Sequence, residues 1–374
     1  MNYLEQDDEP LNREPPVSKL VSSFITEEKE GYDRNHGGIP HIDASKHRVR
    51  VDGAVQNVLD LSVDQLRNDF KQHDVVCVLQ CAGNRRHTMR TRLDEVQGID
   101  WGDAAVMNCK WRGPRLRDIL EKAVVQVDNS EDAHVAFACS TQQCQEDDYY
   151  GGSIKLDRAL REDADVILAL EMNGKPLPVN HGYPVRVVTP AIAGARAVKW
   201  LDHITVQLEE SSNFYQQHDY KVLPPEAKDS ESAEPFWDKV PALQEMPVNS
   251  VIGVPQTGDT VTVGDDGVII AKGYALPSGD DGPVTRVEVS SDDGATWTDA
   301  QLIHRADENV SSKWSWVLWR CEVKLTLGEG RRILSRATDA KGNVQETQSQ
   351  WNLRGVAYSG YGEARDLAVV PEHR

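Results

Sequence analysis

The fold of this chain is decided by one stretch of sequence, Val75-Val76-Cys77-Val78-Leu79-Gln80-Cys81-Ala82-Gly83-Asn84-Arg85-Arg86. Its first residues are apolar on both faces of the backbone, which predicts a buried β-strand. Gly83 and Asn84 favour a sharp turn at the end of that strand. Cys81 therefore lies where a strand passes into a loop, a usual place for ligands in α/β domains. A thiolate beside two guanidinium groups predicts an anion site next to a sulfur-ligated metal.

The composition is that of a globular protein and argues against several kinds of partner. The chain has 374 residues, of which 39% are hydrophobic and 27% are charged, and this length suits two domains. No apolar stretch approaches the roughly 20 residues that a membrane helix needs, so we expect no membrane partner. The formal net charge of -19 argues against nucleic acid. It also repels dianions in general, so a dianionic substrate requires a local basic pocket.

Neither end of the sequence carries a recognisable targeting pattern. Met1 to Pro16 is acidic and contains no basic-then-apolar or twin-arginine signal. Pro371 to Arg374 differs from the Ser-Lys-Leu peroxisomal address. We therefore expect a cytoplasmic protein, with peroxisomal and mitochondrial locations as alternatives.

The six cysteines are too sparse for a disulfide scaffold, and none forms the C-x-x-C pair of zinc ribbons. Cys81 differs from the others because Arg85, Arg86, Arg90 and Arg92 follow it closely. Their charge should lower the thiol pKa from about 8.5 and keep the thiolate form. Two alternatives are a buried core cysteine beside a solvated arginine face, and a phosphatase loop. The phosphatase loop requires six steps from cysteine to arginine, whereas Arg86 lies five steps on and position 87 is histidine.

Helical and strand patterns are mixed through the first 220 residues. Ser62-x-x-Gln65 is a capping box that predicts a short helix through Phe70. Apolar residues at helical spacing predict a second helix over 115–122. Asn173-Gly174 predicts a tight turn. Strands are expected at 47–55, 75–81, 166–172, 183–189 and 204–208.

The pattern changes after Tyr220. Residues 221–249 contain five prolines and little periodicity, which is typical of a linker. From Val251 onward, short alternating strands are separated by Gly-Asp turns, and this spacing predicts an immunoglobulin-like sandwich. We therefore predict an α+β protein. Its parts are an N-terminal arm (1–30), a mixed α/β domain (31–222), a linker (223–249) and an immunoglobulin-like β-sandwich (250–374).

The cysteine loop resembles the molybdenum-binding loop of the eukaryotic sulfite oxidase and nitrate reductase family. Further motifs match that family in the same order. They are Arg34-Asn35-His36-Gly37-Gly38-Ile39-Pro40, Glu171-Met172-Asn173-Gly174, His181-Gly182-Tyr183-Pro184-Val185-Arg186, Gly194-Ala195-Arg196-Ala197-Val198-Lys199-Trp200-Leu201 and Trp351-Asn352-Leu353-Arg354-Gly355-Val356. The resemblance covers about residues 17 to 358. It implies the sulfite oxidase fold for the molybdopterin-binding α/β domain and a dimerisation role for the sandwich.

The resemblance also implies a set of site residues. In the family, the cysteine is the single protein ligand of molybdenum, and two dithiolene sulfurs of molybdopterin and two oxo groups complete the coordination. Cys81 is thus implied as metal ligand and not as nucleophile. Cofactor contacts are implied at Tyr32, Asp33, Arg34, Asn35, His36, Cys81, His181, Arg186, Ala197, Val198 and Lys199. A substrate site is implied at Arg34, Arg86, Trp101, Tyr220 and Arg354. Whether Gln142 replaces an aspartate that contacts the cofactor in the family stays open.

Two positions favour sulfite over nitrate within this family. Arg354 stands where nitrate reductases usually have methionine, and Tyr220 stands where they usually have asparagine. Three arginines suit a compact dianion such as sulfite or sulfate, whereas nitrate is a monoanion. Trp111-Arg112-Gly113 is closer to the nitrate reductase sequence. An assimilatory nitrate reductase-type molybdenum domain is therefore the alternative.

The implied reaction is oxygen-atom transfer from Mo(VI) to sulfite, after which two electrons pass from Mo(IV) to an acceptor. The sequence contains no His-Pro-Gly-Gly haem loop, so we expect no haem and a likeness to the haem-free plant type, in which oxygen can be the acceptor. A homodimer is expected. A binding protein whose first domain has lost its metal is disfavoured, because Cys81 and the three arginines are all present.

Overall fold

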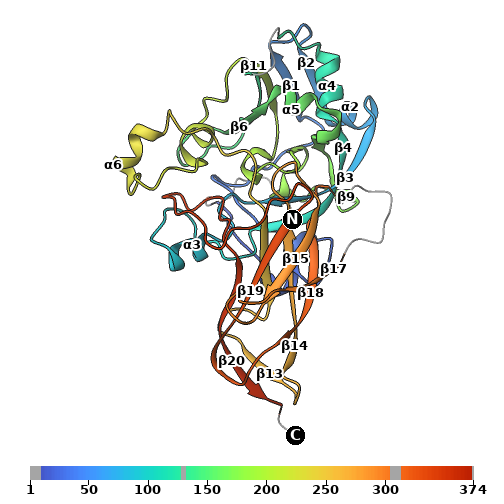
Figure 1. Cartoon of the computed structure of the whole chain (residues 1–374). Coiled ribbons are helices and arrows are strands. Elements are labelled where there is room, and N and C mark those ends of the chain that lie inside the picture. Colours follow the sequence, from blue (N-terminus) through green and yellow to red (C-terminus); the bar gives the residue numbers. More distant parts are fainter. Residues whose placement is uncertain (1–9, 128–131, 304–312, 373–374) are drawn as a thin grey trace.

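The computed structural model describes residues 10–127, 132–303 and 313–372. Figure 1 shows two lobes, with the sheets of the first half of the chain above the long strands of the second half. The first nine residues of the expected N-terminal arm lie outside the described residues. No helix in the described ranges is long and apolar enough to span a bilayer.

The upper lobe contains a five-stranded sheet with the order β2-β1-β11-β5-β6. Its strands are β1 (Arg48–Gly53), β2 (Leu59–Ser62), β5 (His134–Cys139), β6 (Tyr150–Lys155) and β11 (His203–Gln207). Buried side chains of the helices α2 (Val63–Asn68), α4 (Leu116–Ala123) and α5 (Leu156–Leu160) share one apolar core with this sheet. The capping box at the start of α2 is confirmed, because Ser62 and Gln65 exchange both hydrogen bonds.

A second, four-stranded sheet carries the cysteine loop and has the order β3-β4-β8-β9. Its strands are β3 (Gln72–Gln80), β4 (Val106–Pro114), β8 (Glu171–Met172) and β9 (Lys175–Pro176). Asn173 and Gly174 have positive φ angles of 53° and 79° in the turn between the last two strands, as the tight turn requires. The antiparallel pair β7 (Ile167–Ala169) and β10 (Arg186–Val188) lies next to this sheet.

Both faces of β3 are buried because the strand lies between the two lobes. Cys77, Leu79 and Cys81 belong to a core cluster of the upper lobe. Val78 packs on the opposite side, in a cluster that contains residues of the lower lobe, and its N–H donates to the Trp314 carbonyl at 2.9 Å. The apolar character of both faces therefore reflects a contact between lobes as well as the sheet core.

The lower lobe consists of two facing sheets that share one apolar core. One sheet has the order β12-β14-β18-β17, with β12 (Asn249–Val254), β14 (Val268–Leu276), β17 (Gln301–Ile303) and β18 (Val317–Lys324). The other has the order β13-β20-β19-β15-β16, with β13 (Thr260–Val263), β15 (Val284–Ser290), β16 (Thr298–Asp299), β19 (Gly328–Asp339) and β20 (Gly362–Pro371).

The segments expected as arm and linker are packed rather than extended. In the arm, α1 (Val17–Leu20) buries Val17 and Leu20 between Val106 of the upper lobe and Val251 of the lower lobe. In the linker, Leu223 and the helix α6 (Ser230–Ala233) pack against Leu353. The remaining short helices are η1 (Glu28–Glu30), α3 (Arg86–Arg92), η2 (Glu162–Ala164), η3 (Val179–His181), η4 (Gly194–Arg196), η5 (Tyr215–Asp219) and η6 (Glu234–Phe236).

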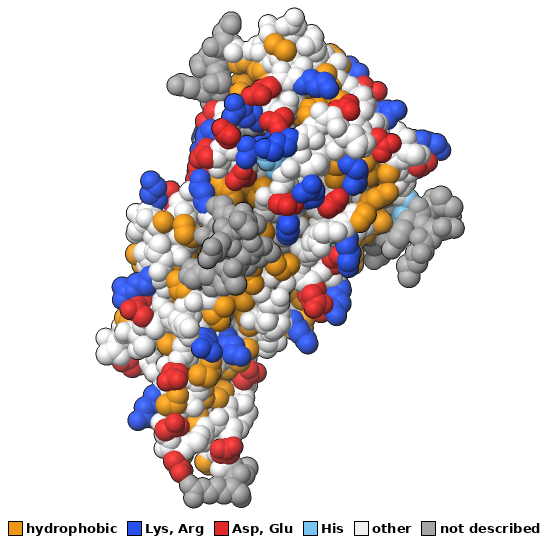
Figure 2. All heavy atoms as spheres, turned by 90° about the vertical axis from the view of Figure 1, so that its right-hand side faces the viewer, with side chains coloured by type: hydrophobic (Ala, Val, Ile, Leu, Met, Phe, Trp, Pro, Cys, Tyr) orange, Lys and Arg blue, Asp and Glu red, His pale blue; other side chains and the backbone are white. Residues whose placement is uncertain are grey.

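The charges of the surface are mixed in sign. On the face shown in Figure 2, Lys and Arg side chains lie close to Asp and Glu side chains over both lobes. A net charge of -19 is therefore spread over a surface that also carries many cations. Such a surface lacks, on this face, the continuous basic stripe that nucleic-acid binding requires.

Arg85 fastens the cysteine loop to the lower lobe. Its φ angle of 70° is left-handed, and its side chain is only 2% exposed. The guanidinium donates to Asn249 Oδ1 at 2.8 Å and to the carbonyl oxygens of Gly360 and Tyr361, both at 2.7 Å. It also stacks over the ring of Tyr358 at 4.4 Å. Arg85 thus points away from the pocket that the sequence led us to expect for the whole arginine cluster.

We expect Arg85→Met to lower the midpoint of thermal unfolding by roughly 5 °C, because it removes three charge-assisted hydrogen bonds from the buried junction of the two lobes. Arg92→Met is the matched control on the same helix, since Arg92 is exposed and pairs with Glu363 at the surface. Its midpoint should change by less than about 1 °C. Equal midpoints for the two variants in differential scanning calorimetry would contradict this role of Arg85.

Candidate functional site

A pocket lies where the cysteine loop meets loops from the whole upper lobe. It holds about 620 Å³ of space between atoms, part of which opens to solvent. The polar groups of its wall come from segments that are far apart in the sequence, so the fold and not local sequence assembles them. The lining residues are Tyr32, Arg34, Asn35, His36, Cys81, Ala82, Met107, Gln142, Tyr150, His181, Arg186, Gly194, Ala195, Ala197, Lys199, Trp200 and Tyr220.

Cys81 is held in the pocket wall by its own backbone. Its N–H donates to the Ala105 carbonyl at 2.9 Å, and Asn84 N–H donates to its carbonyl at 3.0 Å. Asn84 Oδ1 in turn accepts from Ala105 N–H at 3.1 Å. This loop closes directly on the neighbouring strand, so the thiol has little freedom to move. A rigid single thiol is a suitable ligand for a metal that brings further ligands with it.

The pKa of the Cys81 thiol differs from our expectation. Burial raises this pKa, and the charges of Arg86 and Arg34 only partly oppose the rise. The expected thiolate was wrong for the protein alone, because counting nearby arginines ignored the cost of burying an anion. A metal at this position would deprotonate the thiol, since a coordinated thiol loses its proton.

Arg86 is buried beside the cysteine and reaches the end of the lower lobe. Its Nε donates to the Arg354 carbonyl at 3.0 Å, and its Nη1 donates to the Ile99 carbonyl at 2.8 Å. Gly83 makes room for the guanidinium, because a Cβ there would lie 2.5 Å from Arg86 Cζ. Any larger residue at Gly83 would displace the cation. Arg86 and Arg354 are therefore linked by a direct hydrogen bond.

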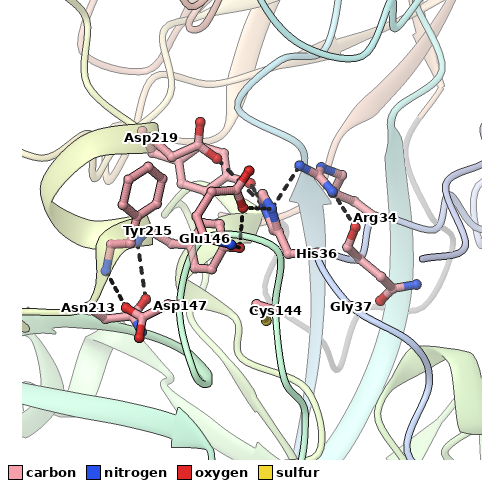
Figure 3. A network of polar contacts seen from close by, with 12 residues as sticks. Arg34, His36, Gly37, Cys144, Glu146, Asp147, Asn213, Tyr215 and Asp219 are labelled. Carbon is pink, nitrogen blue, oxygen red and sulfur yellow. Dashed lines mark hydrogen bonds and ion pairs between the residues drawn. The ribbon is translucent and has the colours of Figure 1, made fainter. Parts of the chain in front are cut away.

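A polar network around His36 joins Arg34 to Glu146, Tyr215 and Asp219, as Figure 3 shows. His36 lies at its centre, with Nε2 2.7 Å from the Tyr220 hydroxyl and Nδ1 3.1 Å from Arg34 Nη2. Asp219 is close to His36 and forms an ion pair with Arg354. Burial and the nearby cations Arg34 and Arg354 hold the His36 pKa well below its usual value. His36 is therefore neutral and links Arg34 to Tyr220 by hydrogen bonds without adding charge.

Another group of cations lies deeper in the wall. Arg186 donates to the carbonyls of His181 and Ala197, both at 3.0 Å, and burial lowers its pKa to about 10. Lys199 donates to Asn35 Oδ1 and to the Asn180 carbonyl. Burial lowers the Lys199 pKa to about 7, and it lowers the His181 pKa to about 4. This wall is cationic and buried, which suits a bound anion.

Most of the expected site residues lie together at this pocket, but five stand behind its lining. Three of these five residues, Arg86, Trp101 and Arg354, are not pocket-lining residues but pack behind them. Asp33 is fully buried and accepts from Arg13 and from Asn180 Nδ2. Val198 belongs to the core of the upper lobe. Asp33 therefore supports the pocket wall from outside.

Several residues of the site were missed by reasoning from the sequence. Met107, Tyr150 and Trp200 line the pocket, and Asp219 orients Arg354. Asp219 had a signal, because it directly precedes Tyr220. Gln142 also lines the pocket, and its amide donates to the carbonyls of Gly37 and Gly38 at 3.1 and 2.6 Å. Gln142 thus holds the loop that follows Arg34.

Comparisons with known proteins identify two families along the chain. Residues 36–215 match the family described as "Oxidoreductase molybdopterin binding domain". Residues 240–362 match the "Mo-co oxidoreductase dimerisation domain". The first match covers the region that forms the pocket, and the second covers the lower lobe.

Individual relatives agree with these families. Mitochondrial sulfite oxidase of Homo sapiens is 41% identical over 93% of this chain and 62% of its own length. Sulfite oxidase of Arabidopsis thaliana is 37% identical over 93% of this chain and 89% of its own length. Nitrate reductase of Solanum lycopersicum is also 37% identical, over 93% of this chain but 39% of its own length. The chain thus spans less than two thirds of the human relative.

A solved structure agrees with the fold. The sulfane dehydrogenase SoxCD of Paracoccus pantotrophus superimposes with a TM-score of 0.76 over 97% of this chain and 90% of that chain. Their sequences are 21% identical, so the likeness concerns the fold alone. The expected combination of a mixed sheet and helix domain with a β-rich dimerisation domain is confirmed at this level.

The residues of the pocket fit a molybdenum–molybdopterin cofactor. Among the described residues, no three His, Cys, Asp or Glu side chains converge to hold a metal, so a metal here requires ligands beyond the protein. Cys81 supplies one sulfur. Three buried N–H groups around the pocket have no hydrogen-bond partner within the described part of the chain, namely Trp101 Nε1, Arg186 Nε and Arg354 Nε. Unpaired donors beside cations suit an anionic cofactor and an anionic substrate.

We expect sulfate to bind the cofactor-free protein more tightly as the pH falls from 8 to 6. Lys199 gains its proton over this range because its pKa is about 7, whereas His36 and His181 stay neutral. If sulfate binds only when Lys199 is charged, its affinity should rise roughly tenfold between pH 8 and pH 6. Isothermal titration calorimetry measures this affinity. Lys199→Met should bind sulfate with no such pH dependence. A pH dependence that survives this substitution would exclude Lys199 as its source.

Proposed function

The chain belongs to the sulfite oxidase family, and from this membership we propose that it oxidises sulfite to sulfate by oxygen-atom transfer at a molybdenum–molybdopterin centre. One observation supports this most directly, namely that Cys81 lies in the pocket wall near the charges of Arg34 and Arg86, and that Arg86 donates to the Arg354 carbonyl. When bound, the cofactor supplies the oxygen atom and accepts two electrons. The protein supplies the thiol ligand, the cationic site for the anion and the exclusion of water.

In this proposal, Arg34, Arg86 and Arg354 neutralise the substrate dianion and position it with charge-assisted hydrogen bonds. Trp101 contributes a buried N–H donor. Because Arg34 donates to His36 Nδ1, neutral His36 donates from Nε2 to the Tyr220 oxygen, and the Tyr220 hydroxyl can donate to the substrate. Burial raises the Tyr220 pKa, so the phenol keeps its proton at neutral pH and remains a donor. These donors stabilise the charge that develops on sulfate.

The cofactor contacts assigned by resemblance form the rest of the proposed site. Cys81 would bind the metal, and the pterin would be held by Tyr32, Arg34, Asn35, His36, His181, Arg186, Ala197 and Lys199. Asp33 and Val198 act from behind this wall, the first through its hydrogen bonds to Arg13 and Asn180. Gln142 keeps the Gly37–Gly38 loop in place through its two amide hydrogen bonds.

Nitrate reduction is the second candidate, because a nitrate reductase shares comparable identity with this chain. Arg354 favours sulfite, since the ion pair with Asp219 and the hydrogen bond to Gln97 Oε1 hold its guanidinium next to Arg86 and Tyr220. A third cation stabilises a bound dianion more than a bound monoanion. Tyr220 favours sulfite for a similar reason, because its hydroxyl adds a donor.

The accompanying proposals concern the parts of the chain and its partners. The division into an arm (1–30), a molybdopterin-binding catalytic domain (31–222), a linker (223–249) and a dimerisation domain (250–374) follows the change in sequence pattern. The facing sheets of the lower lobe support an immunoglobulin-like class.

Oxygen or another acceptor takes the electrons, with no haem in these 374 residues. The location is cytoplasmic, with mitochondrial and peroxisomal alternatives.

Molybdenum content and substrate choice test the proposed reaction together. In a host that makes the cofactor, the wild-type chain should contain molybdenum and reduce ferricyanide with sulfite. Cys81→Ser should lose more than about 100-fold in activity because it lacks the thiolate ligand. Cys321→Ser, in the lower lobe, is the control and should keep its molybdenum and its activity with sulfite. A rate with nitrate and reduced viologen, without a rate with sulfite, would establish the nitrate alternative.

The dimerisation family of residues 240–362 leads us to expect a homodimer. Light scattering coupled to size exclusion should give twice the chain mass of 41.7 kDa at micromolar concentration. A mass of one chain at that concentration would contradict it.

A further inference from the structure

The segment Leu11–Glu14, which we call the N-terminal strap, lies outside both matched families and directly beside the cofactor loop. Arg13 and Asp33 pair as antiparallel strands do, with N–H to carbonyl distances of 2.9 and 2.8 Å in the two directions. The Arg13 guanidinium also donates to Asp33 Oδ2 at 2.9 Å from Nη2. The strap is therefore fixed to the residue that precedes Arg34.

Asn12 connects the strap to Arg34 itself. Its Oδ1 accepts from Arg34 Nη1 at 3.3 Å and from Asn35 N–H at 3.0 Å. Asn35 Nδ2 returns a hydrogen bond to the Leu11 carbonyl at 2.8 Å. One amide oxygen thus sets both the backbone of the loop and the direction of a guanidinium that lines the pocket. Arg34 forms its other hydrogen bonds with the Asn35 carbonyl and with His36.

Glu14 connects the strap to the loop of Trp101. Its two carboxylate oxygens accept from the N–H groups of Gly102 at 2.6 Å and Ala104 at 3.1 Å. The same loop holds the cysteine turn, because Gly102 and Trp101 carbonyls accept from the N–H groups of Arg85 and His87. The carboxylate is partly buried, so these two charge-assisted hydrogen bonds are better protected from solvent than bonds at the open surface.

We propose that the N-terminal strap is a positioning element of the substrate site, in which Asn12 sets the direction of Arg34 and Glu14 sets the position of Trp101. This inference rests on the proposed function, because that function assigns the anion to Arg34 and Trp101. Neither Asn12 nor Glu14 contacts the Cys81 thiol or Lys199 directly, and Asn12 reaches the proposed pterin wall only through Arg34 and Asn35. Their loss should therefore weaken anion binding more than it weakens cofactor retention. Arg13 differs, since it acts through Asp33 on the cofactor side of the wall.

The test compares Asn12→Ala, Asn12→Asp and Glu14→Gln with Lys19→Ala in the cofactor-loaded protein. Asn12→Asp keeps the acceptor oxygen, and Lys19 is an exposed residue of the same arm. Molybdenum per chain and the midpoint of thermal unfolding report on cofactor retention and folding. The KM and kcat for sulfite, and the rise in the unfolding midpoint with added sulfate, report on the anion site.

For Asn12→Ala we expect wild-type molybdenum content, a KM for sulfite raised about tenfold and a kcat within about twofold. The sulfate-induced rise in the midpoint should shrink in parallel. Asn12→Asp should have a KM for sulfite close to that of wild type, and Lys19→Ala should match wild type. The KM of Glu14→Gln should lie between those of wild type and Asn12→Ala. This combination differs from a purely structural loss, which lowers the midpoint and the molybdenum content instead.

Two results would overturn the inference. One is a wild-type KM and a wild-type sulfate response in both Asn12→Ala and Glu14→Gln. The other is a loss of molybdenum with an unchanged KM, which would mean that the strap retains the cofactor and does not position the substrate site. If Asn12→Ala does not fold, the comparison of Glu14→Gln with wild type decides in the same way. An inactive wild type would refute the proposed sulfite oxidation, whereas the sulfate response would still test the strap.

Discussion

The guanidinium of Arg85 is buried in the lower lobe, where it donates to Asn249 and to the carbonyls of Gly360 and Tyr361. Because the φ angle of Arg85 is left-handed, the next residue turns the other way, and Arg86 enters the space beside Cys81. The two adjacent arginines therefore do different things. Arg85 ties the cysteine loop to the second lobe, and Arg86 brings positive charge to the pocket. Arg354, which comes from that second lobe, reaches Arg86 only because the lobes are joined here.

The pocket is a local exception to the charge of the chain. A formal charge of -19 repels anions over much of the surface, so selectivity for a small dianion requires a cationic interior. Two groups of cations supply it. Arg34 and Arg354 are linked through His36 and Asp219, and Arg86 donates to the Arg354 carbonyl. Arg186 and Lys199 are held by backbone carbonyls of the wall. The pKa of Lys199 is low because its ammonium group is buried and because Arg186 and Arg34 lie close to it.

Much of the fold follows from periodicity. The strand that ends at Cys81, the capping box of Ser62 and Gln65, and the turn at Asn173-Gly174 are each encoded by neighbouring residues, and each was predicted. The candidate site residues came from the resemblance, and the structure brings most of them to one pocket. Local sequence could not show that Arg85 points away, because a single left-handed residue breaks the pattern at the turn. Nor could it show the pKa of Cys81, which depends on burial by loops more than 50 residues away. The strap was invisible for the same reason, since Asn12 and Arg34 meet only in the folded chain.

The central claim is that Cys81 ligates a molybdenum centre that takes electrons from sulfite. X-ray absorption at the molybdenum edge of the loaded protein tests it most directly. We expect one sulfur neighbour fewer in Cys81→Ser than in wild type, and an edge that moves to lower energy when sulfite, but not nitrate, is added to the oxidised wild type. The same number of sulfur neighbours in both proteins, or an edge that sulfite leaves in place, would contradict it.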